Sequence, residues 1–368
     1  MKFMSTKHEL IEALTIASKT LAKGNTPIQS LLSFQLTVEN DLLKIESTNL
    51  SEGTTTILPI SAGENGSILV EGRIFIEIIK KLPDAMIMVE TKDTAFIIDC
   101  GATHFELKSI ADEFPIIPNT PKAGVRVDGL LFRNLIDRAG YATGDGTTNA
   151  IFGGINICLS DDQMQIVSID GYRFAVGYEK NQIKGEKFDI VISAASLIDM
   201  VKSIKQKQDV EIIVDEHMFY LKTENTVHSC RLIEGMPVEV TKFMPKEKPA
   251  IVLQRIDKQS LIQCVERSLI LKNGSNNLLE CTISCDTLTL QVKNEIGTSH
   301  EEMPIQSSHP ENGLKFGING KFFLDALKHY PSETVNINLS SNVAPILIGA
   351  EGLNDAAFIL PIRTQETV

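Results

Sequence analysis

Apolar and polar positions along the chain follow a pattern that repeats three times, with a period of about 125 residues. The clearest copies are helical segments at 70–84, 192–206 and 318–332. Each has a short apolar lead and a small or polar residue, then apolar positions at helical spacing with Lys or Arg between them. A period this long is that of a small domain and not of a solenoid unit. The sequence therefore predicts three similar domains.

A second helix is predicted ahead of each of these segments, at 7–23, 127–143 and 256–270. In the first of them, four apolar residues follow the intervals of three and four that mark one buried face: Leu10, Leu14, Ala17 and Leu21. Glu12, Lys19 and Lys23 fall on the other side. Because the two helices start about half a repeat apart, each repeat is interpreted as two similar halves.

Strand-like alternation fills the space between the helices, at 33–48, 154–169, 279–294, 86–100, 210–223 and 335–350. Each stretch reads as two short strands around a polar turn, and strands joined so closely are antiparallel. The predicted fold class is α+β, with two helices per domain packed on antiparallel sheets. Proline-containing stretches at 113–124 and 235–249 place the domain limits. The predicted domains are 1–122, 123–248 and 249–368.

The net charge of −12 and the pI near 5.2 argue, as averages, against a nucleic-acid-binding protein. The distribution of the charges changes this picture, because Lys and Arg recur on the polar faces of the predicted helices and acidic residues crowd the strands and turns. These cations are Lys19, Lys23, Arg73, Lys80, Arg133, Arg138, Lys202, Lys205, Arg267, Lys272, Lys321 and Lys328. Two interpretations stay open: ordinary solvated helix faces, or a basic inner surface if the helices share one side of the fold.

Few features of the sequence point to export, metal binding or catalysis. The chain has no N-terminal apolar run and no apolar stretch approaching 18 residues, so a cytoplasmic protein is expected. Its six cysteines are scattered through apolar segments and are expected to be buried reduced thiols. The glycine-rich stretch 142–154 lacks the Gly-Lys-Ser/Thr ending of a phosphate loop, and HExxH and GxSxG motifs are missing. We therefore expect no enzyme, no cofactor and no metal.

Three segments resemble the bacterial DNA polymerase III beta subunit family, the sliding clamps: SIDGYRFAV at 168–176, FGINGKFFLDAL at 316–327 and FILPIR at 358–363. They occur in the family's order within a threefold repeat that covers the whole chain. The resemblance implies a head-to-tail homodimer that closes a ring of six domains around duplex DNA, with helices inside and sheets outside. It also implies a processivity factor without a catalytic site of its own. The implied partners are the polymerase III catalytic subunit, the clamp-loader complex, and other replication and repair proteins, but no membrane.

The resemblance also assigns residues to three surfaces. The cations expected to face DNA in the pore are Lys19, Lys23, Arg73, Lys80, Arg138, Lys202, Lys205, Lys272 and Lys328. The pocket expected to bind short linear peptides with Leu and Phe anchors consists of Phe152, Ile169, Gly171, Tyr172, Arg173, Phe174, Pro237, Lys242, Phe243, Asn319, Phe322, Val343, Leu360, Pro361, Ile362 and Arg363. The dimer contact is expected between His104 and Phe105 of one copy and Ile270 and Leu271 of the other.

Several positions depart from the family pattern. Tyr172 stands where the family often has His, Ile169 where it often has Thr, and Phe174 is bulkier than the usual Leu. Residues 364–368 also follow the segment at which the family's chains usually stop. A reshaped pocket and a divergent paralogue are therefore open alternatives, as is plain core packing for Phe152, Val343 and Leu360. Two other functions stay open: a scaffold that never encircles DNA, and an unrecognised enzyme acting at 142–154 or 170–173.

Overall fold

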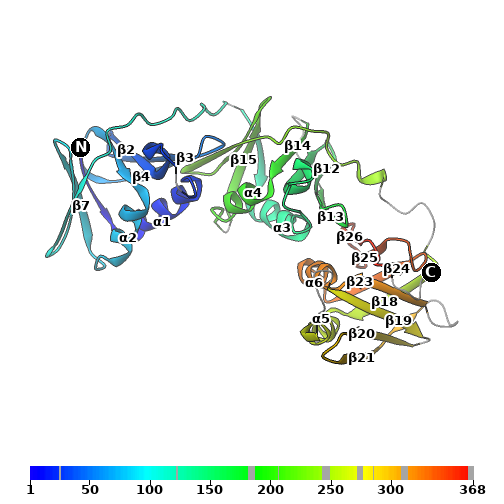
Figure 1. The fold of residues 1–368 in the computed structure, drawn as a ribbon. Coiled ribbons are helices and arrows are strands. Elements are labelled where there is room, and N and C mark those ends of the chain that lie inside the picture. Colours follow the sequence, from blue (N-terminus) through cyan, green and yellow to red (C-terminus); the bar gives the residue numbers. More distant parts are fainter. Residues whose placement is uncertain are drawn as a thin grey trace. The chain divides into compact units, whose positions relative to one another are not determined.

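The computed structural model describes residues 1–24, 26–121, 123–180, 187–205, 207–242, 249–271, 277–284, 286–307 and 314–363 (Figure 1). The first repeat contains β1 (Lys2–Thr6), α1 (Lys7–Ala17), β2 (Ser33–Glu39), β3 (Leu42–Thr48), β4 (Glu52–Pro59), β5 (Ser61–Glu64), β6 (Gly66–Glu71), α2 (Gly72–Lys81), β7 (Met86–Lys92), β8 (Ala95–Cys100) and β9 (Thr103–Lys108). The second contains β10 (Val125–Asp128), α3 (Gly129–Ala139), β11 (Gly154–Leu159), β12 (Gln163–Ile169), β13 (Arg173–Lys180), β14 (Phe188–Ser193), α4 (Ala194–Val201), β15 (Asp209–Val214), β16 (Met218–Lys222) and β17 (Thr226–Arg231).

The third repeat contains β18 (Ile251–Asp257), α5 (Lys258–Ser268), β19 (Leu278–Ser284), β20 (Thr287–Lys293), β21 (Thr298–Pro304), β22 (Gln306–Ser307), β23 (Leu314–Asn319), α6 (Gly320–His329), β24 (Thr334–Leu339), β25 (Ile346–Gly349) and β26 (Ala356–Ile359). Each repeat therefore runs strand, helix, several strands, helix and three strands. All the paired strands in the described residues are antiparallel, as the close strand pairs predicted. The strands β1, β10 and β18, which lead into the first helix of each repeat, were not predicted.

Most helices begin where a strand ends, at a residue whose side chain caps the helix. Thr6 and Glu9 form a reciprocal capping box at the start of α1. Glu71 accepts a hydrogen bond from the third residue of α2, Asp257 does the same for α5, and Asn319 caps α6. These caps explain why each chain segment changes from strand to helix without a loop.

The apolar stripe predicted on the first helix is buried, but the helix is shorter than predicted. Leu10, Leu14 and Ala17 are fully buried, and α1 ends at Ala17. A 3-10 turn, Ser18–Thr20, then carries the chain to Leu21, which is also buried. Leu21 fills the space beside Gly72, the first residue of α2, where a Cβ would lie 2.6 Å from Leu21 Cδ1. The pair α1 and α2 is thereby packed closely together.

Two compact units divide the described chain in a different way from the three predicted domains. Unit 1 consists of Met1–Leu130 and Ala195–Leu232, and unit 2 of Leu131–Ala194 and Ile233–Val368. The eight-stranded sheet of unit 1 joins the first repeat to the second through β4 and β17, and the nine-stranded sheet of unit 2 joins the second to the third through β13 and β26. Each half of the middle repeat thus shares a sheet with a neighbour. The predicted limits at 122 and 248 lie outside the described residues and stay predictions.

Smaller sheets complete each unit. Unit 1 has a five-stranded sheet in the order β5-β1-β7-β8-β9, and unit 2 has a four-stranded sheet in the order β21-β20-β19-β23. In unit 1 the apolar faces of α1 and α2 close over the core with Phe34, Phe75 and Phe96. In unit 2, α5 and α6 pack together over a core that includes Phe316 and Phe323. The polar faces of these helices are left to solvent, which positions the candidate sites.

Candidate functional site

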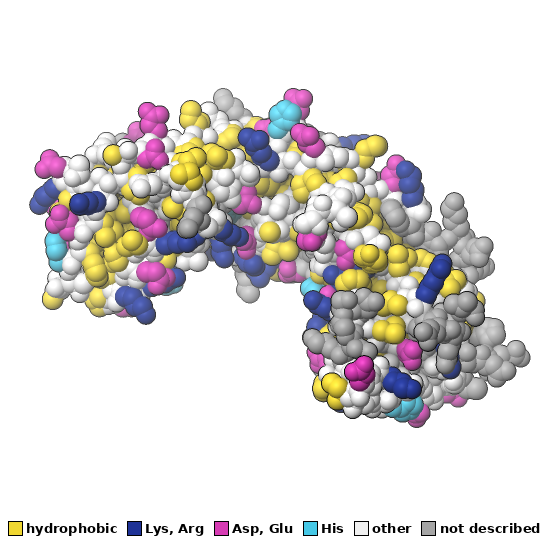
Figure 2. Space-filling view, viewed as in Figure 1, with side chains coloured by type: hydrophobic (Ala, Val, Ile, Leu, Met, Phe, Trp, Pro, Cys, Tyr) yellow, Lys and Arg dark blue, Asp and Glu magenta, His cyan; other side chains and the backbone are white. Residues whose placement is uncertain are grey.

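A basic depression lies on unit 1, where α1 and α2 pack together. It has a volume of about 510 Å³ and is lined by Thr15, Ser18, Lys19, Leu21, Lys23, Arg73, Ile76, Glu77, Lys80 and Asp199. Figure 2 shows dark-blue Lys and Arg side chains gathered beside the part of unit 1 that holds α1. Four cations outnumber two carboxylates here, so the potential is positive and suits an anion such as a phosphate.

Cations in the basic depression differ in how strongly they are already paired. Lys80 donates a hydrogen bond to Glu77 at 2.8 Å, and this contact holds the pKa of the Glu77 carboxyl below its usual value. Lys19 and Lys23 form no ion pair within the described part of the chain. These two lysines are therefore the ones most available to a bound anion.

Two further predicted cations of unit 1 form ion pairs on the surface. The Lys202 ammonium lies 2.9 Å from Asp199, and that of Lys205 lies 2.6 Å from Glu12. Their side chains are 57% and 60% exposed. Exposed pairs of this kind contribute only about 0–1 kcal/mol, so a phosphate can replace the carboxylate partner.

Arg138 is more enclosed than expected for a residue predicted to face DNA. Arg138, on α3, is only 17% exposed, and its guanidinium lies 2.8 Å from both Glu179 and Asp355. It also donates a hydrogen bond to the Tyr178 carbonyl oxygen at 3.2 Å. Because two carboxylates neutralise and enclose it, this arginine is a structural group of unit 2. The polar-face pattern could not show this, since both carboxylates are distant in sequence: Glu179 lies on β13 and Asp355 just before β26.

The structure describes one of the other two cations predicted in unit 2. Lys328, on α6, pairs with Glu266 on α5 at 2.7 Å. Lys272 lies outside the described residues. Among the predicted pore cations that the structure describes, those without a carboxylate partner are Lys19, Lys23 and Arg73, and all three line the basic depression of unit 1.

Two residues of the predicted peptide pocket belong to a buried apolar cluster of unit 2. Ile169 and Phe174 are buried there, in one cluster with Val240 and Phe358. The Phe174 and Phe358 rings stack with their centroids 4.2 Å apart. We call these four residues the pocket floor. Val240 and Phe358 were not predicted, because apolar residues in a strand or linker give no sign in the sequence that they border a site.

Exposed apolar side chains accompany this floor. Tyr172, Val343 and Leu360 are 67%, 56% and 45% exposed, so they are not core residues. The Leu360 N–H donates to the Tyr172 carbonyl oxygen at 2.9 Å, which holds these two residues side by side. Gly171 has φ +89°, and a Cβ there would lie 3.2 Å from the Phe152 ring. The turn before Tyr172 therefore requires glycine.

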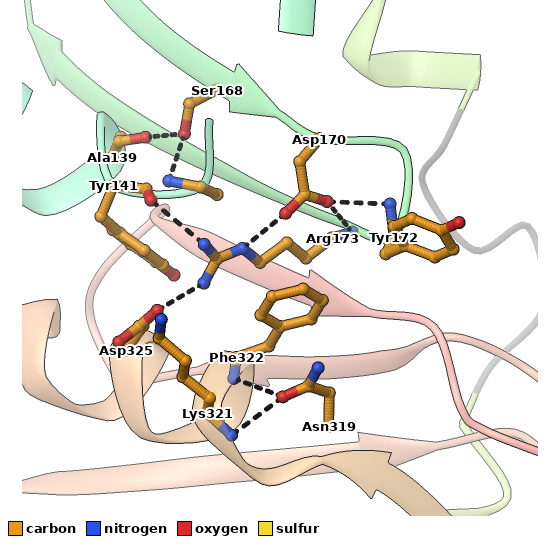
Figure 3. A network of polar contacts seen from close by, with 11 residues as sticks. Ala139, Tyr141, Ser168, Asp170, Tyr172, Arg173, Asn319, Lys321, Phe322 and Asp325 are labelled. Carbon is orange, nitrogen blue, oxygen red and sulfur yellow. Dashed lines mark hydrogen bonds and ion pairs between the residues drawn. The ribbon is translucent and has the colours of Figure 1, made fainter. Parts of the chain in front are cut away.

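Arg173 does not point into the pocket but into a polar network (Figure 3). Its guanidinium bonds Asp170 at 3.0 Å and Asp325 at 2.8 Å, and reaches the Tyr141 carbonyl oxygen at 3.5 Å. The Phe322 ring covers one face of it, 4.2 Å from Cζ to the ring centroid. Only 9% of the Arg173 side chain is exposed. Arg173 is thus next to the predicted pocket, but three of its side-chain N–H donors are already used.

The other predicted pocket residues differ in their contacts and in their exposure. Asn319 caps α6 through its side chain, and the Ile362 N–H bonds the Gly317 carbonyl oxygen at 2.7 Å. Lys242 and Arg363 are exposed, whereas Pro237 and Pro361 are half-buried. Phe243 lies outside the described residues.

The predicted dimer residues of unit 1 lie at the edge of a sheet. His104 and Phe105 are on β9, the edge strand of the five-stranded sheet, and His104 Nδ1 lies 2.7 Å from Asp99. Phe105 is 38% exposed and, with Ile74 and Ile78 of α2, lines a groove of about 400 Å³. Arg73, Glu77 and Lys81 complete this apolar groove. The contribution of α2 was not predicted.

The predicted dimer residues of unit 2 lie beside another edge strand, β21. Ile270 is 77% exposed and Leu271 is half-buried. The hairpin between β20 and β21 comes next to them, because the Asn294 side chain donates to the Leu271 carbonyl oxygen at 2.8 Å. Its tip carries Ile296, which is 86% exposed. Ile270 and Ile296 are the apolar knobs of this surface.

The glycine-rich stretch and most of the cysteines are part of the folded framework. In the glycine-rich stretch, the Gly144 N–H bonds the Phe152 carbonyl oxygen at 2.7 Å. Cys100, Cys230, Cys264 and Cys281 are buried free thiols as expected, whereas the free thiol of Cys158 is only half-buried, and Cys285 lies outside the described residues. Within the described ranges, His, Cys, Asp and Glu nowhere form a group of three placed to hold a metal.

Three family models match the chain in succession: the N-terminal, central and C-terminal domains of the DNA polymerase III beta subunit, at residues 1–118, 126–237 and 241–363. The chain belongs to the DNA polymerase III beta subunit family. Members of this family are sliding clamps, processivity factors without catalytic activity. The prediction from the three motifs and the predicted fold class are thereby confirmed.

Individual relatives are distant in sequence but similar along the whole chain. The beta sliding clamp of Bacillus subtilis (strain 168) is 25% identical over 99% of this chain and 100% of its own length. That of Staphylococcus aureus (strain Mu50) is 26% identical over 83% of this chain and 82% of its own. A solved Pseudomonas aeruginosa sliding clamp, bound to griselimycin, has a TM-score of 0.93 at 21% identity, with 99% of this chain and 100% of that one covered.

A putative DNA polymerase III beta subunit from Eubacterium rectale also shares the fold, with a TM-score of 0.91 at 24% identity, covering 99% of this chain and 100% of its own. Among the described residues, every helix is too short or too polar to cross a membrane.

Proposed function

We propose that two copies of this clamp close head to tail into a six-domain ring that encircles duplex DNA and tethers the replicative polymerase. The basic depression carries the proposal, because it sets Lys19, Lys23, Arg73 and Lys80 around one cavity in a member of the clamp family. Attraction to phosphates is independent of base sequence and allows movement along the duplex. Enclosure by the ring then keeps the protein on DNA without a tight grip.

The cations of the proposed pore are not equivalent. Those of unit 1 are the four lysine and arginine residues of the basic depression, joined by Lys202 and Lys205 on its flank. Lys328 and Lys272 of unit 2 stay in the proposed set, whereas Arg138 leaves it because its guanidinium is enclosed by Glu179 and Asp355. We propose that unit 1 supplies most of the attraction.

Closure of the ring is supported by two exposed apolar surfaces, one on each unit. Ile270 and Ile296 are exposed apolar knobs on unit 2, and Ile74, Ile78 and Phe105 line an apolar groove on unit 1. Each surface adjoins a sheet edge, β21 or β9, with unpaired backbone groups. Burying both in a head-to-tail contact of two copies removes these edges and covers the apolar side chains.

The pocket floor and the exposed Tyr172, Val343 and Leu360 support a peptide site on unit 2. Such a site, with an apolar floor and a polar rim, suits a short linear peptide with Leu and Phe anchors. The proposed ligands are segments of the polymerase III catalytic subunit, the clamp loader, and other replication and repair proteins. All these partners act on DNA, so the proposed location is the cytoplasm.

Retention on DNA of different topology tests the ring. The protein is assembled on a nicked circular plasmid with a clamp loader and ATP, and the complex is isolated by gel filtration. We expect the clamp to stay on the circle and to leave within minutes after a restriction enzyme linearises it. Equal retention before and after linearisation would show binding without enclosure.

Charge reversal tests the role of the basic depression. The double variant Lys19→Glu, Lys23→Glu should bind duplex DNA more weakly than the wild type at low salt, and its log affinity should fall less steeply with log salt, by about 0.9 in slope for each lost phosphate contact. The control variant Lys44→Glu, Lys222→Glu makes the same charge change on strands β3 and β16. If the two variants lose DNA equally, net charge matters and the depression does not.

Light scattering tests the dimer contact. The double variant Ile270→Ala, Leu271→Asp should elute as a monomer, because the first change removes an apolar knob and the second places a carboxylate beside a contact that excludes water. Ile116→Asp is the control, since Ile116 is 94% exposed and lies outside both surfaces. A dimer that survives the double change at micromolar concentration would contradict this assignment.

A further inference from the structure

The turn that carries Tyr172 is fixed at its backbone, although its ring is free. One carboxylate oxygen of Asp170 accepts hydrogen bonds from the Tyr172 and Arg173 N–H groups, both at 2.9 Å. The Tyr172 carbonyl oxygen accepts the Leu360 N–H at 2.9 Å. The ring itself is 67% exposed. A rigid backbone under an exposed aromatic side chain is the arrangement of a preformed binding surface.

Arg173 connects this turn to a helix that lies outside it. The second carboxylate oxygen of Asp170 accepts the Arg173 Nε–H at 3.0 Å, and the same guanidinium donates to Asp325 of α6 at 2.8 Å. Figure 3 shows Arg173 extended between the two carboxylates, with the Phe322 ring beside it. Asp170 therefore holds the turn with one oxygen and Arg173 with the other.

Asp325 is the second carboxylate that pairs with Arg173 in this network. Arg173 is 9% exposed and Asp170 is 10% exposed, so the guanidinium and its first partner are largely removed from water. Asp325 is 31% exposed and also lends its backbone carbonyl oxygen to His329 Nδ1 at 2.8 Å. The His329 ring stacks on Tyr141, whose own carbonyl oxygen accepts from Arg173. The network thus runs from α6 to the turn without using any exposed side chain of the peptide site.

We infer that Asp325 and Arg173 are positioning residues of the peptide site: they set the Tyr172 turn through Asp170 and make no contact with the peptide. This inference rests on the proposed peptide site. Asp325 is a second acceptor for a guanidinium that has little access to water, so its loss leaves donors unsatisfied. Arg173 then moves towards solvent, Asp170 loses its orientation, and the backbone under Tyr172 loosens. Peptide affinity falls because the turn must be ordered again on binding.

Peptide binding to isosteric variants tests the inference. A fluorescein-labelled decapeptide with Leu and Phe anchors is titrated with the wild-type dimer, with Asp325→Asn and with Asp325→Glu. We expect Asp325→Asn to bind about tenfold more weakly, which is about 1.4 kcal/mol, and Asp325→Glu to recover most of the affinity. Asp137→Asn is the matched control, because Asp137 is 61% exposed on α3. Light scattering of each variant checks that the dimer is intact.

A fluorescent reporter tests the mechanism without any peptide. The chain contains no tryptophan, so Tyr172→Trp introduces a single emitter on the turn. In that background, Asp325→Asn should lower the steady-state anisotropy of the tryptophan, whereas Asp137→Asn should leave it unchanged. The two proposals fail in different ways. A wild-type dimer that binds no peptide contradicts the peptide site, and equal peptide affinity or equal anisotropy in Asp325→Asn contradicts the positioning role.

Discussion

The sheet joins of unit 1 and unit 2 use the same backbone ladder but different side-chain chemistry. In unit 1, the pairing of β4 with β17 is accompanied by neutral groups, with His228 between Thr54 at 3.0 Å and Ser203 at 2.9 Å. In unit 2, the pairing of β13 with β26 is accompanied by the ion pairs of Arg138. The backbone therefore sets how the repeats join, while side chains decide how each join responds to pH and to the loss of one group.

Burial explains why the two joins differ in their charge. His228 is 2% exposed, and desolvation lowers its pKa to about 4, so it is neutral at pH 7 and serves as a hydrogen-bonding group. Burial raises the pKa of Asp355, but Arg138 next to it favours the ionised carboxylate. The neutral join needs no counterion, whereas the ionic join depends on each of its members.

The largest expected effect comes from removing the central cation of the ionic join. Arg138→Ala leaves Asp355, which is 7% exposed, without its cation, and a broken buried pair costs about 3–5 kcal/mol. Urea unfolding should show this loss of free energy of unfolding. Arg133→Ala, on the same helix but 43% exposed, should change it by less than about 0.5 kcal/mol. Equal effects of the two changes would show that the ionic join is not special.

An intermediate effect on the free energy of unfolding is expected when the pH of the solution is lowered, because the neutral join contains His228. The pKa of His228 is about 4 in the folded protein and about 6.5 when unfolded, so the unfolded chain binds the extra proton first. Its contribution is full above pH 6.5 and falls by about 3 kcal/mol as the pH approaches 4. The free energy of unfolding, measured with urea at several pH values across this range, should depend less steeply on pH in His228→Gln than in the wild type. His8→Gln, at an exposed position on α1, is the control and should keep the wild-type slope.

The smallest effect is expected from one neutral hydrogen bond. Thr54→Val removes the hydroxyl that faces His228 Nδ1 and should lower the free energy of unfolding by about 1–2 kcal/mol. Thr55→Val changes the next residue, whose side chain points to the opposite face of β4, and should have little effect. A loss in Thr54→Val as large as that in Arg138→Ala would remove the contrast between the joins.

Much of the fold was predictable because it depends on local periodicity. The helices and the close strand pairs follow from spacing, and the turn between β2 and β3 is visible as Asn40-Asp41, both with positive φ. The two compact units were not predictable in this way. They depend on β4 meeting β17 and β13 meeting β26, and such pairing between distant strands leaves no period in the sequence.

The sites were predictable to a similar extent. The polar-face lysines Lys19 and Lys23 do line one cavity, but the same pattern included Arg138, because a helix face does not show which carboxylates come to meet it. Motif resemblance marked Arg173 near the pocket but could not show that Asp170 and Asp325 occupy its donors. Those facts depend on tertiary contacts alone.

The shared sheets determine which fragments of the chain can be produced without exposing an unpaired strand. A fragment that stops near residue 122 would keep β4 but lose β17, and so expose to solvent the backbone of the five β4 residues that pair with β17, 52–56. Such a piece is expected to stick to its own copies through that strand, even though its helices and apolar interior are complete. A fragment that keeps the eight-stranded sheet whole would combine 195–232 with the first repeat. It would need a linker in place of the removed residues between these two segments.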